Sequence, residues 1–291
     1  MAAYSIKDLE KLSGIKAHTI RIWEKRYSLF EPTRTGTNRR LYSDEDLRKI
    51  INIAVLSRNG MKISHISHLT ISEIDEKVEF LSRENNLTEN HIDGLVIAMI
   101  DFNEDAFNSI IMKSILNTGF EETIENLVFP FMRRIGLLWQ TGSVSPAQEH
   151  FISNIIKKRI LVATDSLSVP KRENRKKVLL FLPDNELHDL GLLYYSYLVR
   201  KNGSDLIYLG QMMPLDSLDE LNRKWNPDII VTGIVTSSTY LTPDEYVFEL
   251  SSVFPGKIVL VSGLLADAAV GTPGNVLPIR SPSEMIGYLN S

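Results

Sequence analysis

Cysteine is absent from the 291 residues of this chain. Without thiols, the sequence excludes a disulfide framework, a zinc site built on cysteine and a thiol nucleophile. Long apolar runs are also missing, because no stretch approaches the roughly 20 residues that a membrane-spanning helix needs. The first residues, MAAYSIKDLEKLSG, lack the basic and then apolar order of a secretion signal. We therefore expect a cytoplasmic protein that makes no contact with a membrane.

Charge is distributed unevenly along the chain. Residues 1–70 contain 13 Lys and Arg against 7 Asp and Glu, although the whole chain has a net charge of −4. A basic segment on an otherwise acidic protein predicts that this segment meets an anionic partner. With 43% hydrophobic and 23% charged residues, the composition is that of a globular protein with two or three domains.

The basic segment predicts two short helices and a wing. Ser5 is a candidate N-cap for a helix that ends at Ser13-Gly14, and a second helix runs from about Lys16 to Tyr27. This order is that of a helix-turn-helix, whose second helix enters the major groove of DNA. The stretch 29–43, LFEPTRTGTNRRLYS, is rich in turn formers and arginines, so it predicts a β-hairpin wing. A capped helix from Ser43 follows.

Residues 4–70 resemble the winged-helix DNA-binding domain of the MerR family of bacterial transcription regulators. The matching residues are Tyr4-Ser5-Ile6, Gly14, Thr19-Ile20-Arg21-Ile22-Trp23-Glu24, Arg26-Tyr27, Pro32, Arg34 and Arg40-Leu41-Tyr42-Ser43. The resemblance implies phosphate contacts for Arg21, Arg40 and Tyr42, and positions nearest the bases for His18 and Thr19. The DNA-binding residues expected are Lys16, His18, Thr19, Arg21, Arg26, Arg34, Arg39, Arg40 and Tyr42. A basic three-helix module that binds protein is the alternative.

One such module buries too little surface for tight specific binding, roughly 600–1,000 Å². We call this DNA-binding domain, residues 1–72, the head. We therefore expect a homo-oligomer, a dimer or a tetramer, that places several heads on a double-stranded DNA operator. No RNA partner is expected.

The middle of the chain predicts helices only. After a DNA-binding domain of residues 1–72, the polar residues 73–87 form a connector. In residues 88–168 apolar side chains recur at spacings of three and four, as in a four-helix bundle. The bundle helices are expected at roughly 89–101, 103–117, 119–140 and 145–166.

Three bundle residues form a candidate constellation. Trp139 lies near the end of the third helix, and Glu149 and His150 lie on the fourth. The turn between the helices would bring them to one end of the bundle. Taken alone, a core tryptophan and two solvated side chains account for them.

Strands and helices alternate in the last third of the chain. After a charged linker at 169–177, strands are expected at 178–183, 205–210, 228–235 and 257–263. This alternation predicts an α/β doubly wound parallel sheet over residues 178–291. The expected fold is therefore multidomain: a winged helix-turn-helix, a four-helix bundle and a Rossmann-like domain. Ligands of such sheets lie at the carboxyl ends of the strands.

The loop after the first of these strands has the sequence PDNELHDLG. A neutral imidazole at His188 can ligate a metal, and the carboxylate of Glu186 can set its tautomer. An ordinary capped loop is the alternative. The loop resembles the cobalamin-binding loop of B12-dependent proteins, Asp-x-His-x-x-Gly, with Glu186, His188 and Gly191 at the three positions. The resemblance implies that His188 ligates cobalt.

Two further pieces of the B12 pattern can be placed by the same resemblance. Thr232-Gly233-Ile234 stands where the family has Ser-x-Leu after the third strand. Ser262-Gly263 stands for Gly-Gly after the fourth strand, so that Ser262 adds a side chain where the nucleotide tail runs close to the backbone.

The order of the three modules resembles the CarH/LitR group of bacterial photoreceptor repressors. In that group adenosylcobalamin lies between the bundle and the Rossmann-like domain, and the bundle signature is Trp, nine residues, then Glu-His. The resemblance implies that Trp139 packs on the upper face of the cofactor and that Glu149 and His150 contact or enclose the adenosyl group. Members of the group can have a histidine directly after the tryptophan, whereas this chain has Gln140.

The resemblance implies a repressor that is not an enzyme. Cofactor in the dark favours tetramers that bind DNA through several heads, and light breaks the cobalt–carbon bond and disperses them. Two alternatives stay open. A regulator of the same fold that no longer uses B12, and answers to a partner protein or another signal, is suggested by Ser262 and Gln140. The other alternative is a corrinoid methyl carrier.

Overall fold

The computed structural model describes residues 4–84, 88–139, 144–168, 175–235, 242–263 and 273–291. They form two compact units, Met1–Ile155 and Ile156–Ser291. Within the described ranges, no helix has both the length and the apolar character needed to cross a lipid bilayer.

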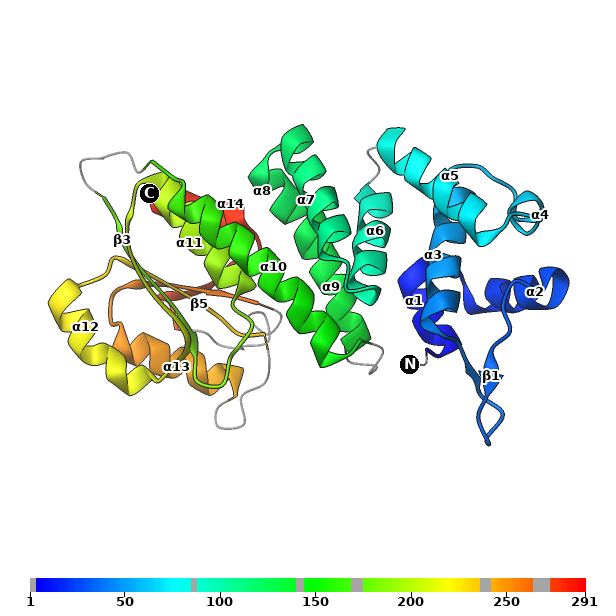
Figure 1. The fold of residues 1–291 in the computed structure, drawn as a ribbon. Coiled ribbons are helices and arrows are strands. Elements are labelled where there is room, and N and C mark those ends of the chain that lie inside the picture. Colours follow the sequence, from blue (N-terminus) through cyan, green and yellow to red (C-terminus); the bar gives the residue numbers. More distant parts are fainter. Residues whose placement is uncertain (1–3, 85–87, 140–143, 169–174, 236–241, 264–272) are drawn as a thin grey trace. The chain divides into compact units, whose positions relative to one another are not determined.

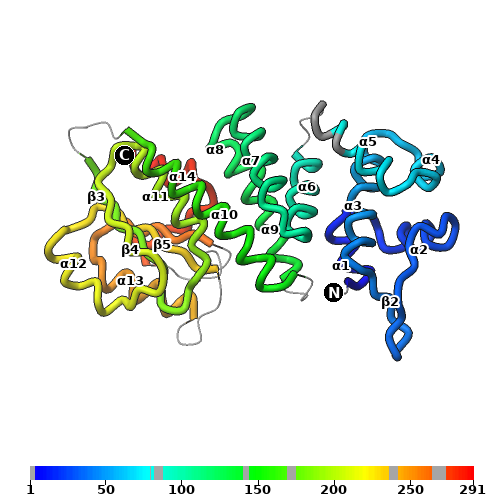
Figure 2. Tube along the Cα trace, in the orientation of Figure 1, coloured from blue at the N-terminus to red at the C-terminus, as the bar shows by residue number. Residues whose placement is uncertain are grey.

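The first unit begins with the helix-turn-helix and wing that the sequence predicts. Its elements are α1 (Ile6–Ser13), α2 (Ala17–Tyr27), β1 (Thr33–Arg34), β2 (Arg40–Leu41), α3 (Asp44–Arg58), α4 (Ile63–Ile66) and α5 (Ile71–Glu84). Ser5 caps α1 as expected, because its hydroxyl accepts from the backbone N–H of Asp8 at 3.3 Å. Gly14, at φ 72°, ends the helix in the left-handed conformation. Figure 2 shows the β1–β2 hairpin extending away from the helices.

Helices continue through the rest of the first unit, within a few residues of the expected bounds. They are α6 (Thr88–Ile100), α7 (Glu104–Thr118), α8 (Phe120–Thr123), the π-helical turn η1 (Ile124–Val128), α9 (Phe129–Trp139) and α10 (Pro146–Asp165), which continues into the second unit. Phe107, Phe131 and Ile135 are buried, as the three-and-four spacing predicts.

The third bundle helix contains a π-helical turn that the sequence analysis did not predict. The N–H of Phe129 donates to the carbonyl of Ile124, five residues earlier. Pro130 follows directly and has no N–H, so it cannot make the ordinary bond to a carbonyl four residues back. The wider turn before Pro130 is one way for a helix to absorb this missing bond.

His91 on α6 makes the stability of the first unit depend on pH. The residue is buried, and its Nε2 has no hydrogen-bond partner. Burial lowers the pKa of His91, and the charge of Lys113 lowers it further. Between its lowered pKa and the ordinary value, the unfolded chain binds more protons than the folded one, so stability falls as pH falls.

We expect this loss to reach at most about 1.4 kcal/mol per pH unit, the value for one proton. His91→Gln should flatten the dependence, as measured by urea unfolding between pH 5 and 7. His68→Gln, at an exposed position, is the control and should keep the wild-type slope. Equal slopes in all three proteins would contradict the assignment.

The second unit is the expected parallel sheet with helices on both faces. Its elements are β3 (Lys177–Pro183), α11 (Leu190–Asn202), β4 (Asp205–Met213), η2 (Leu215–Ser217), α12 (Leu218–Trp225), β5 (Ile229–Gly233), α13 (Pro243–Val253), β6 (Ile258–Ser262), β7 (Val276–Pro278) and α14 (Pro282–Asn290). All strand pairs are parallel, in the order β4-β3-β5-β6-β7. Figure 1 shows α11 and α14 on one face and α12 and α13 on the other.

The strand order places a crevice at the end of β3. This strand has β4 on one side and β5 on the other, so the chain winds away from β3 in opposite directions. Open α/β sheets bind ligands at such switch points, beyond the carboxyl ends of the strands. The loop that carries Glu186 and His188 starts at this point.

Candidate DNA interface and cofactor site

One face of α2 and the wing are basic and exposed. Ile20 and Trp23 point into the core of the head, which leaves the other side of α2 to solvent. The expected DNA-binding residues that are exposed are Lys16, His18, Arg21, Arg26, Arg34 and Arg39, while Thr19 is partly buried. Long cationic side chains on a helix and an adjacent hairpin suit contacts to the DNA backbone and to base edges.

Arg40 and Tyr42 fasten the wing to α2. The Nε of Arg40 donates to both carboxylate oxygens of Glu24, at 3.0 and 3.1 Å. The hydroxyl of Tyr42 donates to Glu24 at 3.1 Å, and Tyr42 is buried. Burial raises the pKa of Tyr42, and the charge of Glu24 adds to that shift. The phosphate contacts expected of Arg40 and Tyr42 remain predictions. Within the head, both residues donate to the carboxylate of Glu24.

We expect Arg40→Ala to lower both stability and DNA affinity. The substitution removes two charge-assisted hydrogen bonds from Glu24 and should cost about 1–2 kcal/mol of the free energy of unfolding. Arg39→Ala, one residue earlier and exposed, should lower affinity alone. Thermal unfolding and fluorescence anisotropy on DNA measure the two effects. An unchanged melting temperature for Arg40→Ala would show that the bond to Glu24 contributes little.

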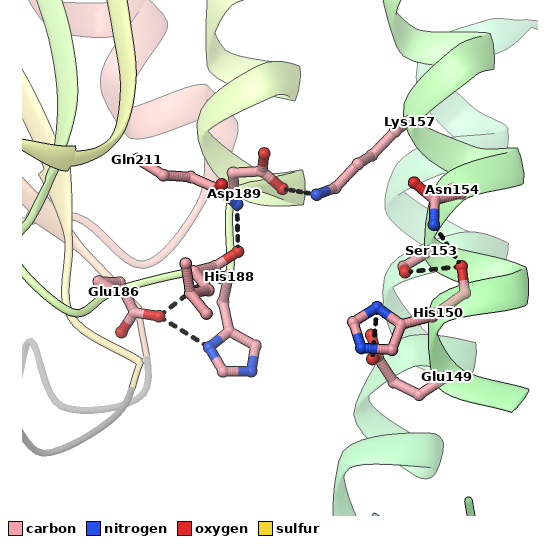
Figure 3. A network of polar contacts seen from close by, with 10 residues as sticks. Glu149, His150, Ser153, Asn154, Lys157, Glu186, His188, Asp189 and Gln211 are labelled. Atoms are coloured by element: carbon pink, nitrogen blue, oxygen red, sulfur yellow. Dashed lines mark hydrogen bonds and ion pairs between the residues drawn. The ribbon is translucent and has the colours of Figure 1, made fainter. Parts of the chain in front are cut away.

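His188 and Glu186 form a hydrogen-bonded pair on the loop between β3 and α11. Figure 3 shows the carboxylate of Glu186 turned toward the imidazole of His188. Oε1 of Glu186 lies 2.7 Å from Nδ1 of His188, and it also accepts the backbone N–H of His188 at 2.9 Å. Oε2 accepts the N–H of Val235 at 2.9 Å, so that Glu186 joins the loop to the end of β5.

This geometry selects one tautomer of His188. Because a carboxylate accepts at Nδ1, that nitrogen carries the proton in the neutral ring, and Nε2 carries the lone pair that a metal binds. Glu186 is only 2% exposed, whereas the side chain of His188 is 57% exposed. The pair is thus an anchored carboxylate that orients an accessible imidazole.

Leu187, beside His188 on the loop, is an exposed apolar residue, and Gln211 of β4 donates to its carbonyl. An accessible imidazole held by a buried carboxylate fits a protein ligand to the metal of a macrocycle, which needs only one or two such ligands.

Lys157 holds the next residue of the loop. Its Nζ lies 2.7 Å from Oδ1 of Asp189, an ion pair without the angles of a hydrogen bond, drawn in Figure 3. Asp189 stands at the N-cap of α11 and is nearly buried. The contact fixes the start of α11 relative to the second part of α10.

Two of the residues that the resemblance assigns to the cofactor site have hydroxyl partners within the domain. A Cβ at Gly191 would meet no atom within 4 Å, so this position is open. The hydroxyl of Thr232 is buried, 3.3 Å from that of Tyr246. The hydroxyl of Ser262 lies 2.9 Å from that of Tyr195.

The backbones of Ile234 and Gly263 lie in close contact. Ile234 is buried, and its N–H donates to the carbonyl of Ser262 at 2.8 Å. Gly263 has a φ of 106°, and a Cβ there would lie 2.4 Å from the carbonyl oxygen of Ile234. The backbone directly after β6 thus requires glycine at 263 for its close approach to Ile234, directly after β5.

A cavity of about 310 Å³ opens at the carboxyl ends of β3, β4 and β5. Ile234 and Tyr246 lie on its apolar side, and Asp184, Glu186, Asp216 and Glu249 contribute carboxylates. Four acidic side chains disfavour a phosphate group in this cavity.

The expected upper-face residues lie in the first unit. Trp139 ends α9 and is 47% exposed, which excludes a purely core role. Glu149 and His150 are adjacent on α10, with 3.8 Å between Glu149 Oε2 and His150 Nδ1, and the His150 side chain is largely exposed. Gln140 and the expected break at 141–143 lie outside the described residues.

Comparisons with known proteins match two segments of the chain. Residues 4–72 match the model of the MerR HTH family regulatory protein, and residues 91–163 match that of the B12 binding domain. The chain is 24% identical over 271 residues to the HTH-type transcriptional repressor CarH of Myxococcus xanthus, covering 90% of this chain and 89% of that protein. It is also 24% identical over 267 residues to the repressor CarA of the same organism, covering 89% and 86%. The chain thus carries a MerR-type DNA-binding domain and a B12-binding domain, and over most of its length it is similar to transcriptional repressors.

The fold of the bundle and the α/β domain also has a solved counterpart. The monomethylamine corrinoid protein of Methanosarcina barkeri superposes with a TM-score of 0.55 at 14% identity, covering 69% of this chain and 98% of that protein. At this identity the likeness shows the fold, a helical segment followed by the α/β domain.

Sequence reasoning missed three features of the regulator. The bond from Val235 to Glu186 and the contact of Lys157 with Asp189 join segments far apart in the sequence, and no local pattern indicates them. The third is Asp93, a buried carboxylate on α6. An acidic residue within the apolar run of this helix is a local pattern that indicates a buried carboxylate.

Proposed function

We propose that this regulator represses transcription in the cytoplasm as an oligomer whose assembly and operator binding depend on adenosylcobalamin and light. The observation that carries the proposal is the exposed imidazole of His188, held at Nδ1 by the buried carboxylate of Glu186. Its position at the switch point of the sheet adds support. When bound, adenosylcobalamin supplies a cobalt–carbon bond that light can break.

The chain's own residues have distinct roles in this proposal. His188 would ligate the cobalt, and Glu186 keeps its ring in the tautomer that presents Nε2. Trp139, Glu149 and His150 would contact or enclose the adenosyl side of the bound cofactor. The exposed basic residues of α2 and the wing bind DNA.

Oligomerisation supplies the gain in DNA affinity. A single head makes a small interface, and joining heads turns the second binding event into an intramolecular one. We propose a dimer or tetramer in the dark that dissociates on illumination, so that each head binds the operator alone and weakly.

An absorbance spectrum and gel filtration test the proposal together. The protein is incubated with adenosylcobalamin in darkness, freed of unbound cofactor and run before and after illumination. We expect bound cofactor by its visible absorbance, a larger particle in the dark and a smaller one after light. Colourless protein, or a particle size that neither cofactor nor light alters, overturns it.

A second candidate is a regulator of the same fold that does not bind cobalamin. The bond between the hydroxyls of Tyr195 and Ser262 favours it, because it joins α11 to the end of β6 where the resemblance places the nucleotide tail. Ser262→Gly distinguishes the candidates. Cofactor binding that appears only in this variant supports the second candidate, and binding by the wild type excludes it.

Trp139→Ala should separate cofactor binding from assembly. The side chain is about half exposed, so we expect the melting temperature to change little. We expect cofactor to bind while the dark particle stays small, because the contact with the adenosyl side is lost. Leu137→Ala, an exposed apolar position on the same helix, is the matched control. Unfolding of the Trp139 variant would instead show a structural role.

A further inference from the structure

A carboxylate with no exposed surface joins the DNA-binding head to the bundle. Asp93 on α6 is 0% exposed, and its two oxygens contact guanidinium groups from different helices. Oδ2 contacts Arg58 at the end of α3 in the head. Oδ1 accepts from Arg134 on α9 at 2.9 Å. Each oxygen therefore holds one segment.

Because Asp93 is buried, it favours the arrangement in which both arginines contact it. Burial raises the pKa of Asp93, while Arg134 and Arg58 oppose the shift. A buried carboxylate is costly without partners, so separating Arg58 from it leaves a charge less well compensated. The carboxylate thus favours arrangements of the head that keep Arg58 in place.

A second ion pair crosses the same boundary but is more exposed. Arg48 on α3 contacts Asp101 after α6, with side chains 40% and 28% exposed. Ion pairs near the surface are screened by water and stabilise weakly. Both pairs start from α3, so removal of one arginine at a time tests which of them positions the head.

The helix that supplies Arg134 also carries Trp139. Both residues belong to α9, and only five positions separate them. α6 lies against both α3 and α9, as Figure 1 shows. A displacement of the end of α9 therefore acts on Arg134, and through Asp93 on Arg58.

We propose that Asp93 is a positioning residue that fixes the DNA-binding head on the bundle and passes movement of α9 to it through Arg134 and Arg58. The head and the bundle then move as one body. A change in what Trp139 contacts therefore changes the orientation of the head. The regulatory use of this link rests on the function proposed above. The link itself does not, because Asp93 makes its contacts in the first unit alone.

Distances between two spin labels test the link directly. The chain has no cysteine, so Lys25→Cys on α2 and Leu116→Cys on α7, both exposed, give a labelled pair in the full-length protein. The measurement uses neither cobalamin nor DNA. We expect one narrow distance distribution in the otherwise wild-type protein.

Three variants of this labelled protein decide the outcome. Arg58→Gln removes the contact from the head while Asp93 keeps Arg134, so we expect the distribution to broaden without a loss of helix signal. Arg48→Gln removes the same charge from the same helix and should leave the distribution narrow. Arg58→Lys should restore much of the narrow form. A narrow distribution in Arg58→Gln, or equal broadening in Arg48→Gln, overturns the proposal.

DNA binding separates this proposal from the one on which its use rests. If the wild type responds to cobalamin, Arg58→Gln should still bind cofactor and assemble but show a smaller dark-to-light ratio of DNA affinity. An unchanged ratio contradicts transmission through Asp93. If the wild type does not respond to cobalamin while Arg58→Gln alone broadens the label distance, the proposed function fails and the positioning role stands.

Discussion

His188→Ala is expected to weaken adenosylcobalamin binding by about 100-fold or more and to abolish assembly that depends on the cofactor. Alteration of a group that merely supports a metal ligand costs about 10–100-fold in metal affinity, and loss of the ligand itself should cost at least as much. The His188 side chain is 57% exposed, so its removal creates no cavity. The melting temperature without cofactor should therefore stay close to that of the wild type.

Glu186→Gln is the companion variant, with a different expected signature. Both carboxylate oxygens accept hydrogen bonds, and an amide can replace only one of them. The other end would direct an NH₂ group at a backbone N–H or at Nδ1 of His188. We expect about 10–100-fold weaker binding together with a lower melting temperature, because a buried donor loses its acceptor.

Titration by absorbance in darkness measures both variants, and thermal unfolding separates the two effects. His68→Ala, an exposed histidine of the head, is the control and should bind cofactor as the wild type does. If His188→Ala retains wild-type affinity, the imidazole is not a cobalt ligand. Weakening by His68→Ala to the same degree would show that the loss is not specific to the loop.

The elements of both units could be predicted because their signals are local. The apolar run at Val178–Leu182 is buried on both sides in a parallel strand, and Ser5 and Gly14 delimit α1 through their own capping contacts. The relation of Glu186 to His188 is also local, since two residues separate them in one loop. Patterns within a dozen residues therefore predicted the fold and the central pair of the site.

The partners of buried polar groups could not be predicted in this way. The resemblance assigned Tyr42 and Arg40 to phosphates, but which acceptor they meet within the head depends on how the wing folds back on Glu24. The contact of Asp93 with Arg58 spans 35 residues, and that of Glu186 with Val235 spans 49. Such contacts follow from tertiary packing, which composition and periodicity do not encode.

The double variant Arg21→Ala, Arg26→Ala is expected to weaken DNA binding about 100-fold on any sequence. Both side chains are exposed on α2, beside a wing that is also basic. A hydrogen bond to a charged group contributes about 1.5 kcal/mol, and about 1.4 kcal/mol is a factor of ten in affinity. Two lost phosphate contacts should therefore cost about two powers of ten. The reduction should be similar on unrelated duplexes, because phosphates carry no sequence information.

The salt dependence of binding distinguishes lost phosphate contacts from a damaged head. Each phosphate contact contributes about 0.9 to the slope of log affinity against log salt, so the double variant should lower the slope by about 1.8. A misfolded head would lose affinity and melt at a lower temperature. Arg223→Ala on α12, an exposed arginine of the second unit, should change neither affinity nor slope. If affinity falls while the slope stays unchanged, α2 does not meet the phosphates through these arginines, and base contacts such as those expected of His18 and Thr19 would carry the binding instead.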